Sequence, residues 1–173
     1  MSDTLQDLER DTDLNQKKTL VTVTATALPA SPWVAFAMKA DYPDKGGKQD
    51  GQSLKFDKLA GAFDVTFDLV DASGLNLAFY PEFADAIWVQ AGTVCPPAQA
   101  GNGNGAIEAG KVSDKQLKMT NLNASPGTLT YMLRFTGDAR DPLHPPYEYD
   151  PQIINGGKGP LDGSSERDEG GCD

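Results

Sequence analysis

The segment from Gly61 to Gly74, GAFDVTFDLVDASG, alternates apolar and mostly polar residues with a period of two. Successive side chains of a β-strand point to opposite faces of the sheet, so this period places one set in a core. The expected inward set is Phe63, Val65, Phe67 and Leu69. The segment predicts a half-buried antiparallel strand. DASG then predicts a turn, and residues 75–80, LNLAFY, are expected to return as the second strand of a hairpin.

Similar patterns recur along the chain between turn-forming residues. Residues 19–28, TLVTVTATAL, place a leucine and three threonines on one face and small apolar residues on the other. Residues 33–40, 128–136 and 147–154 are further expected strands. We count seven to nine short strands, and no convincing amphipathic helix exceeds three turns. This pattern predicts an all-β fold, a single antiparallel β-sandwich of immunoglobulin-like or jelly-roll-like type.

The composition divides the chain into one domain with two tails. Residues 1–18 are expected to form a polar arm, either frayed or ordered against a neighbouring subunit. Residues 19–155 hold the strand patterns and form the predicted β-sandwich domain. Residues 156–173 are rich in glycine and charge and are expected to form an acidic tail. The start of the chain has neither a basic segment nor an apolar one, so we expect a cytoplasmic protein.

The charge of the chain argues against several partners. The 25 acidic and 15 basic residues give a formal net charge of −10. Such a surface repels phosphate backbones and anionic lipids, so we expect no nucleic-acid partner. No stretch approaches the roughly 18–20 apolar residues that span a bilayer, so we expect no membrane insertion.

The two cysteines, Cys95 and Cys172, give no metal-binding or redox motif. A disulfide between them would have to fix the acidic tail. The alternatives are free thiols or a link between two chains.

The chain's single histidine, His144, limits its chemistry. A zinc site or a serine–histidine–aspartate triad would have to be built on it, and no GxSxG motif is present. Oxygen ligands for calcium are more plentiful, and Asp138 and Asp141 are the candidate pair. No other cofactor is expected. The glycine-rich GNGNG at 101–105 lacks the strand, helix and lysine of a phosphate-binding loop, so we interpret it as a loop.

Aromatic side chains suggest a ligand platform as the alternative function. Trp33, Trp88 and Tyr80 could together stack against a sugar or another small ligand. Tryptophans in a small sandwich more often lie in the core or in an interface, so both interpretations stay open.

The closing segment YEYDPQIIN resembles the end of small bacterial inclusion-body (PixA/AidA) proteins and of the DP-EP family. The residues that carry the resemblance are Tyr147, Tyr149, Asp150, Pro151 and Ile153. Glycines follow in place of the acidic–proline pair that the DP-EP pattern would have next. The resemblance implies a cytoplasmic, non-enzymatic protein that self-associates.

These observations favour a non-catalytic protein that works through protein–protein contacts. We expect a homo-oligomer or a larger assembly. The same five residues from Tyr147 to Ile153 are the predicted assembly edge, because Pro151 would place their strand at a sheet edge or end it with a bulge.

Overall fold

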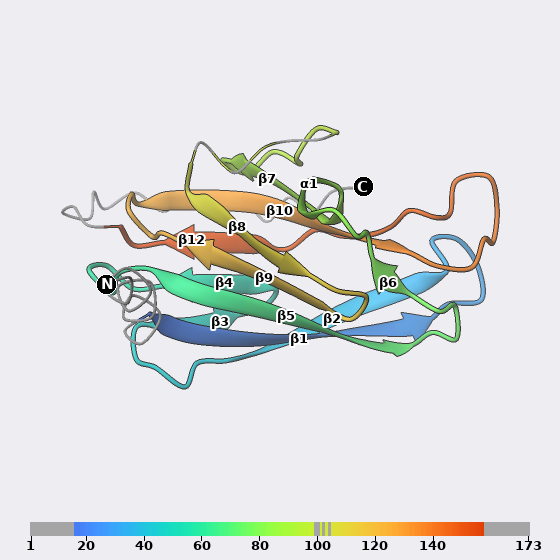
Figure 1. Cartoon of the computed structure of the whole chain (residues 1–173), viewed down its shortest axis with the longest axis horizontal. Helices are drawn as coiled ribbons and strands as arrows, with labels where there is room; N and C mark the ends of the chain where they lie inside the picture. Colours follow the sequence, from blue (N-terminus) through green and yellow to red (C-terminus); the bar gives the residue numbers. More distant parts are fainter. Residues whose placement is uncertain (1–15, 99–100, 102, 104, 158–173) are drawn as a thin grey trace, which may run out of the picture.

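The computed structural model describes residues 16–98, 101, 103 and 105–157. The predicted arm up to residue 15, Cys172 and most of the predicted tail lie outside this part. The described residues form two sheets, packed face to face (Figure 1). None of the helices in that part is long and apolar enough to cross a membrane.

The first sheet has five strands in the spatial order β2–β1–β5–β9–β8. Its members are β1 (Lys17–Ala27), β2 (Val34–Asp41), β5 (Phe63–Ala72), β8 (Ile107–Val112) and β9 (Gln116–Asn121). The second sheet is built around β10, which pairs with β11 and β12 along one side and with β6 and β7 along the other. Its members are β3 (Gly47–Asp50), β4 (Ser53–Phe56), β6 (Ala78–Phe79), β7 (Ile87–Ala91), β10 (Gly127–Thr136), β11 (Tyr147–Tyr149) and β12 (Gln152–Asn155). One short helix, α1 (Phe83–Ala86), precedes β7.

The predicted all-β sandwich is confirmed, and its sheets are mixed rather than wholly antiparallel. β1 pairs with β5 in parallel, and β12 pairs with β4 in parallel. The face assignment of β5 is correct, because Phe63, Val65 and Phe67 are fully buried.

The hairpin predicted after β5 is wrong. Residues 78–79 pair with β10 in the other sheet. Asp71 turns the chain toward that sheet, because its carboxylate accepts hydrogen bonds from the backbone N–H groups of Ser73 and Leu77.

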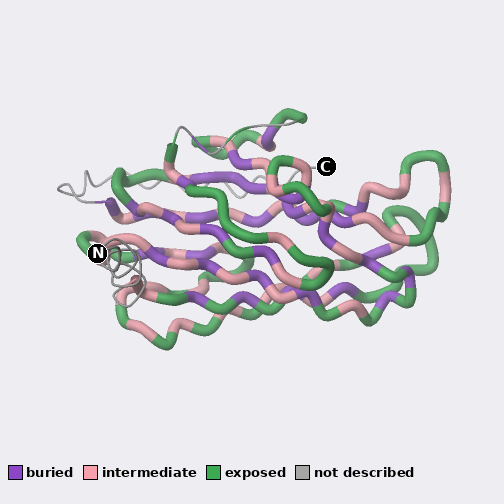
Figure 2. The backbone as a smooth tube through the Cα atoms, viewed as in Figure 1, coloured by how far each residue is buried: buried purple, intermediate pink, exposed green. Residues whose placement is uncertain are grey.

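The core between the sheets is rich in aromatic rings. Phe36 of β2 stacks on Phe135 of β10 with ring centroids 5.1 Å apart, and Phe67 of β5 lies 5.6 Å from Tyr131 of β10. Burying one such ring contributes about 1.5–3 kcal/mol. Figure 2 shows the resulting alternation of buried and exposed positions along the long strands.

Polar contacts also join the two sheets directly. Asn121 of β9 and Asn155 of β12 are both buried, and each side-chain amide donates to the other's oxygen at 2.7 and 3.1 Å. Gln49 of β3 binds the outer edge of β2, accepting from the Ala40 N–H and donating to the Met38 carbonyl at 2.7 and 3.1 Å. The glutamine side chain thus occupies backbone groups that an edge strand would otherwise leave open.

Candidate functional site

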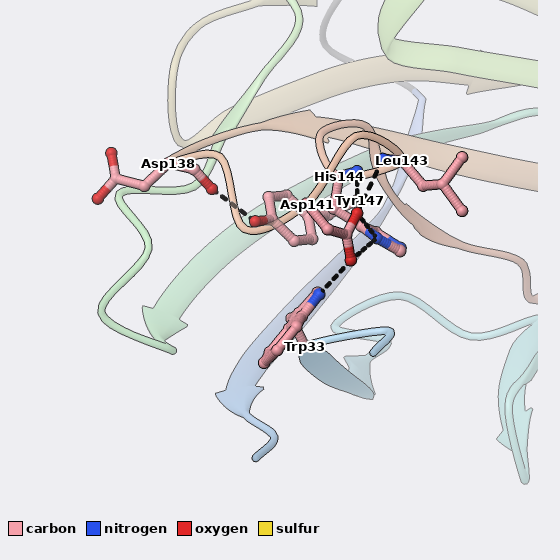
Figure 3. A network of polar contacts seen from close by, with 6 residues as sticks. All are labelled: Trp33, Asp138, Asp141, Leu143, His144 and Tyr147. Carbon is pink, nitrogen blue, oxygen red and sulfur yellow. Dashed lines mark hydrogen bonds and ion pairs between the residues drawn. The ribbon is translucent and has the colours of Figure 1, made fainter. Parts of the chain in front are cut away.

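Loops distant in sequence meet at one end of the sandwich. Trp33, in the loop between β1 and β2, donates its indole N–H to the Asp141 carboxylate in the loop between β10 and β11, at 2.6 Å (Figure 3). Trp33 has φ of 70°, a left-handed conformation that bulky residues rarely adopt. Such strain persists only where the surroundings hold it. The contact therefore fixes an aromatic ring in an uncommon backbone geometry.

The Asp141 carboxylate is held from several directions. It accepts hydrogen bonds from the backbone N–H groups of Leu143 and His144 at 2.8 and 2.9 Å, and His144 Nδ1 lies 3.0 Å away (Figure 3). The Trp33 hydrogen bond, the His144 ring and the Leu143 N–H lower the Asp141 pKa to about 2. The carboxylate is therefore ionised at neutral pH, and it accepts the hydrogen bonds that hold this loop together.

Tyr147 anchors the far end of the same loop. Its hydroxyl donates to the Asp138 carbonyl at 2.6 Å, and its ring lies 5.6 Å from the His144 ring. Burial raises the Tyr147 pKa, so the hydroxyl stays protonated as a donor.

Asp138 and Asp141, the candidate calcium ligands, lie in one loop but make separate contacts. The Asp138 carboxylate accepts from the Asn76 amide at 2.9 Å, whereas Asp141 accepts from N–H donors. Among the described residues no three His, Cys, Asp or Glu side chains are grouped to hold a metal ion.

A small hollow of about 210 Å³ lies beside Trp33. Its lining residues are Ala27, Leu28, Pro29, Trp33, Ser73, Leu75 and Arg140. The Arg140 guanidinium makes no ion pair with any described residue. The hollow therefore combines an apolar wall with one cation.

The three predicted platform residues do not come together. Trp88 and Tyr80 flank Arg134, whose guanidinium lies 3.8 Å from the Trp88 ring and 5.0 Å from the Tyr80 ring. Arg134 also donates to the Glu148 carboxylate at 3.1 Å. Trp33 contacts Asp141 instead. One face of the Trp88 ring is thus covered by a cation that the sequence did not single out.

The residues of the predicted assembly edge belong to two different strands, and Asp150 and Pro151 lie between these strands. Ile153 lies on β12, which pairs with both β10 and β4 and is therefore an interior strand. β11, which holds Tyr147 and Tyr149, pairs with β10 and with no other strand in the described ranges. Pro151 lies between the two strands, where they are interrupted.

Most side chains of that segment face inward. Tyr147, Tyr149, Pro151 and Ile153 are buried, and Asp150 is half-buried. Tyr149 stacks on Phe36 at 5.5 Å and donates its hydroxyl to Gln52. Only the backbone of β11 is thus open for pairing.

Of the two cysteines, Cys95 is disulfide-bonded, and Cys172 lies outside the described residues. Asn123, in an N-glycosylation pattern, is fully buried and donates to the carbonyls of Asp57 and Gly61. Its amide is therefore part of the core.

The sequence matches no family model and no curated protein. The resemblance of residues 147–155 rests on those residues alone.

Proposed function

We propose that this chain is a non-catalytic β-sandwich protein that self-associates, with a second copy packed against the outer face of β1, β2 and β5. The observation that supports this proposal is an uncharged patch on that face, with a lysine and an aspartate at its border. We call it the threonine face; its residues are Thr22, Thr24, Thr26, Ala35, Ala37, Val70 and Ala72.

Strand register places these side chains in rows across three strands. Thr24 pairs with Ala37 on one side and with Val70 on the other, and the next row is Ala35, Thr26 and Ala72. Val70 is 49% exposed although it is apolar. Small side chains at adjacent positions make a flat surface, which is the shape that face-to-face sheet packing needs.

The charges at the border favour a second copy of the same chain. Thr22 pairs with Lys39 on β2 and with Asp68 on β5, so opposite charges lie at the two ends of one row. A two-fold axis parallel to β1 exchanges the two sides of the patch and brings Lys39 of each copy opposite Asp68 of the other. The uncharged centre also lets two chains of net charge −10 approach with little repulsion.

The size of the patch determines how tightly we expect two copies of the chain to bind each other. Strand spacing and residue rise give a surface of about 15 Å by 15 Å. Specific interfaces bury about 800 Å² per partner, so the threonine face and its border support a weak dimer with micromolar to millimolar Kd.

Charge reversal tests the arrangement. In sedimentation velocity over a wide concentration range, Lys39→Glu and Asp68→Lys should each weaken dimerisation, and the double variant should restore it. Ala37→Glu, in the middle of the face, should abolish it. The matched control Ala109→Glu changes an exposed alanine on β8, the opposite edge strand of the same sheet. A strict monomer at every concentration, or a dimer unaffected by Ala37→Glu, would refute the proposal.

The edge of β11 is the other route to assembly, and it is less suited. In the antiparallel pair with β10, the backbone N–H and C=O groups of Glu148 point away from β10. Those of its two neighbours, Tyr147 and Tyr149, point toward β10. Pro145 and Pro146 precede the strand and donate no hydrogen bond. An added strand would therefore find few backbone partners.

A further inference from the structure

We propose that the hollow beside Trp33 binds a carboxylate attached to a small apolar group, with Arg140 holding the carboxylate. This site is independent of the threonine face. It differs from the predicted sugar platform in its residues and in its ligand.

The aromatic wall of the hollow is fixed before any ligand arrives. Trp33 is held at positive φ, and Asp141 holds its indole N–H. Asp141 is itself fixed by two backbone N–H groups of its own loop. A wall that does not reorganise loses little conformational entropy on binding.

Arg140 supplies a cation that has no ion-pair partner among the described residues. Arg134 is engaged by a carboxylate, a backbone carbonyl and two aromatic rings. By contrast, Arg140 is one of the residues that line the hollow, and its guanidinium makes no side-chain hydrogen bond or ion pair within the described ranges. An exposed arginine in a chain of net charge −10 is therefore available to an anion at this site.

The two nearby carboxylates, those of Asp138 and Asp141, do not occupy the place that we propose for the carboxylate of the ligand. Asp141 accepts N–H donors from Trp33 and from its own loop, and Asp138 accepts from Asn76. Neither forms an ion pair with Arg140. Their negative charge disfavours anions of high charge, and a single cation suits an anion with one charge.

The size and lining of the hollow define the rest of the ligand. At about 210 Å³ it is smaller than the roughly 300–1,000 Å³ of drug-sized sites. Leu28, Pro29 and Leu75 form an apolar wall around it. A planar guanidinium binds a carboxylate with two parallel hydrogen bonds. The matching ligand is a short branched or aromatic carboxylic acid, either free or as the C-terminal residue of a peptide.

NMR titration of the ¹⁵N-labelled full chain tests this inference. The two indole N–H signals report on Trp33 and Trp88, and a Trp88→Phe variant assigns them. We expect 4-methylpentanoate to shift the Trp33 signal saturably, while 4-methylpentanamide does not and Trp88 stays unchanged. Arg140→Gln should weaken binding by about tenfold or more, and Arg140→Lys by less, because lysine keeps the charge but loses the paired geometry.

The control and the peptide arm complete the test. Lys111→Gln removes one exposed positive charge from β8 and should leave binding unchanged. An N-acetyl dipeptide ending in leucine, free or amidated, distinguishes the sources: tighter binding of the free-acid peptide than of 4-methylpentanoate assigns the site to a chain end, and weaker binding assigns it to a small acid. Equal shifts by acid and amide, no shift at all, or undiminished binding by folded Arg140→Gln would overturn the inference.

Discussion

Trp33 and Asp141 lie 108 residues apart in the chain and are joined by a hydrogen bond of 2.6 Å. The first residue precedes β2 in one sheet, and the second follows β10 in the other. Their contact therefore ties the two sheets together at one end of the sandwich. The Asn121–Asn155 pair also joins the sheets, through β9 and β12. Both contacts are polar, although the core between the sheets is aromatic.

Asp141→Asn should destabilise the protein at neutral pH, with a deficit that shrinks in acid. The folded-state pKa of Asp141, about 2, lies below its ordinary value of 3.8. A depressed carboxyl pKa stabilises the folded state above the ordinary value, and this contribution is lost as pH falls toward 2. Chemical denaturation at pH 7, 4 and 2.5 measures it. Glu108→Gln, which removes an exposed carboxylate from β8, is the control. A deficit independent of pH would contradict the assignment of the charge to this contact.

Thr19→Val should stabilise the protein by about 1 kcal/mol. Thr19 on β1 is fully buried, and its hydroxyl oxygen has no hydrogen-bond partner among the described residues. Valine has nearly the same shape and no polar group to desolvate. Urea denaturation gives the comparison. Thr22→Val, at an exposed position of the same strand, should change stability by less than about 0.5 kcal/mol. A loss of stability in Thr19→Val would show that the hydroxyl does have a partner.

The periodicity of the sequence was sufficient to predict the β-sandwich and to predict which face of each long strand is buried. In β5 and β10 every second residue is apolar, so the pattern alone determines which side is buried. Pairing partners were not predictable in this way. β1 and β5 lie side by side in parallel because the chain crosses to the other sheet between them, and no local pattern records that crossing.

The loop-end site was only partly predictable. The sequence singled out Trp33, Asp141 and His144 by residue type, each for a different purpose, and the structure joins them in one network. Arg140 was missed because one arginine in a polar loop is common. Its role depends on apolar neighbours such as Leu28 and Leu75, which come from two other loops. A contact between loops more than 50 residues apart leaves no signal in residue spacing.

Asn121→Ala and Asn155→Ala should each cost about 1–3 kcal/mol, because each leaves a buried amide without its partner. The double variant should cost less than the sum of the two. The shortfall measures their coupling, which we expect to reach about 1 kcal/mol. Urea denaturation of the four proteins in this cycle provides it. Strict additivity would mean that the two amides stabilise the sheets independently.

Gln49→Ala should destabilise the fold by about 1 kcal/mol and raise its tendency to aggregate. The substitution frees the Ala40 N–H and the Met38 carbonyl on the outer edge of β2. Antiparallel alternation turns the backbone of Phe36 to the same side, so the variant exposes a continuous row of unpaired groups. Such an edge is a template for another strand.

Light scattering during mild heating, together with thioflavin fluorescence, measures this effect. Gln90→Ala is the matched control, because Gln90 lies on β7, is also half-buried, and its side chain makes no hydrogen bond to any described residue. We expect faster aggregation of the Gln49 variant alone. Equal rates for the two variants would show that the glutamine does not protect the edge.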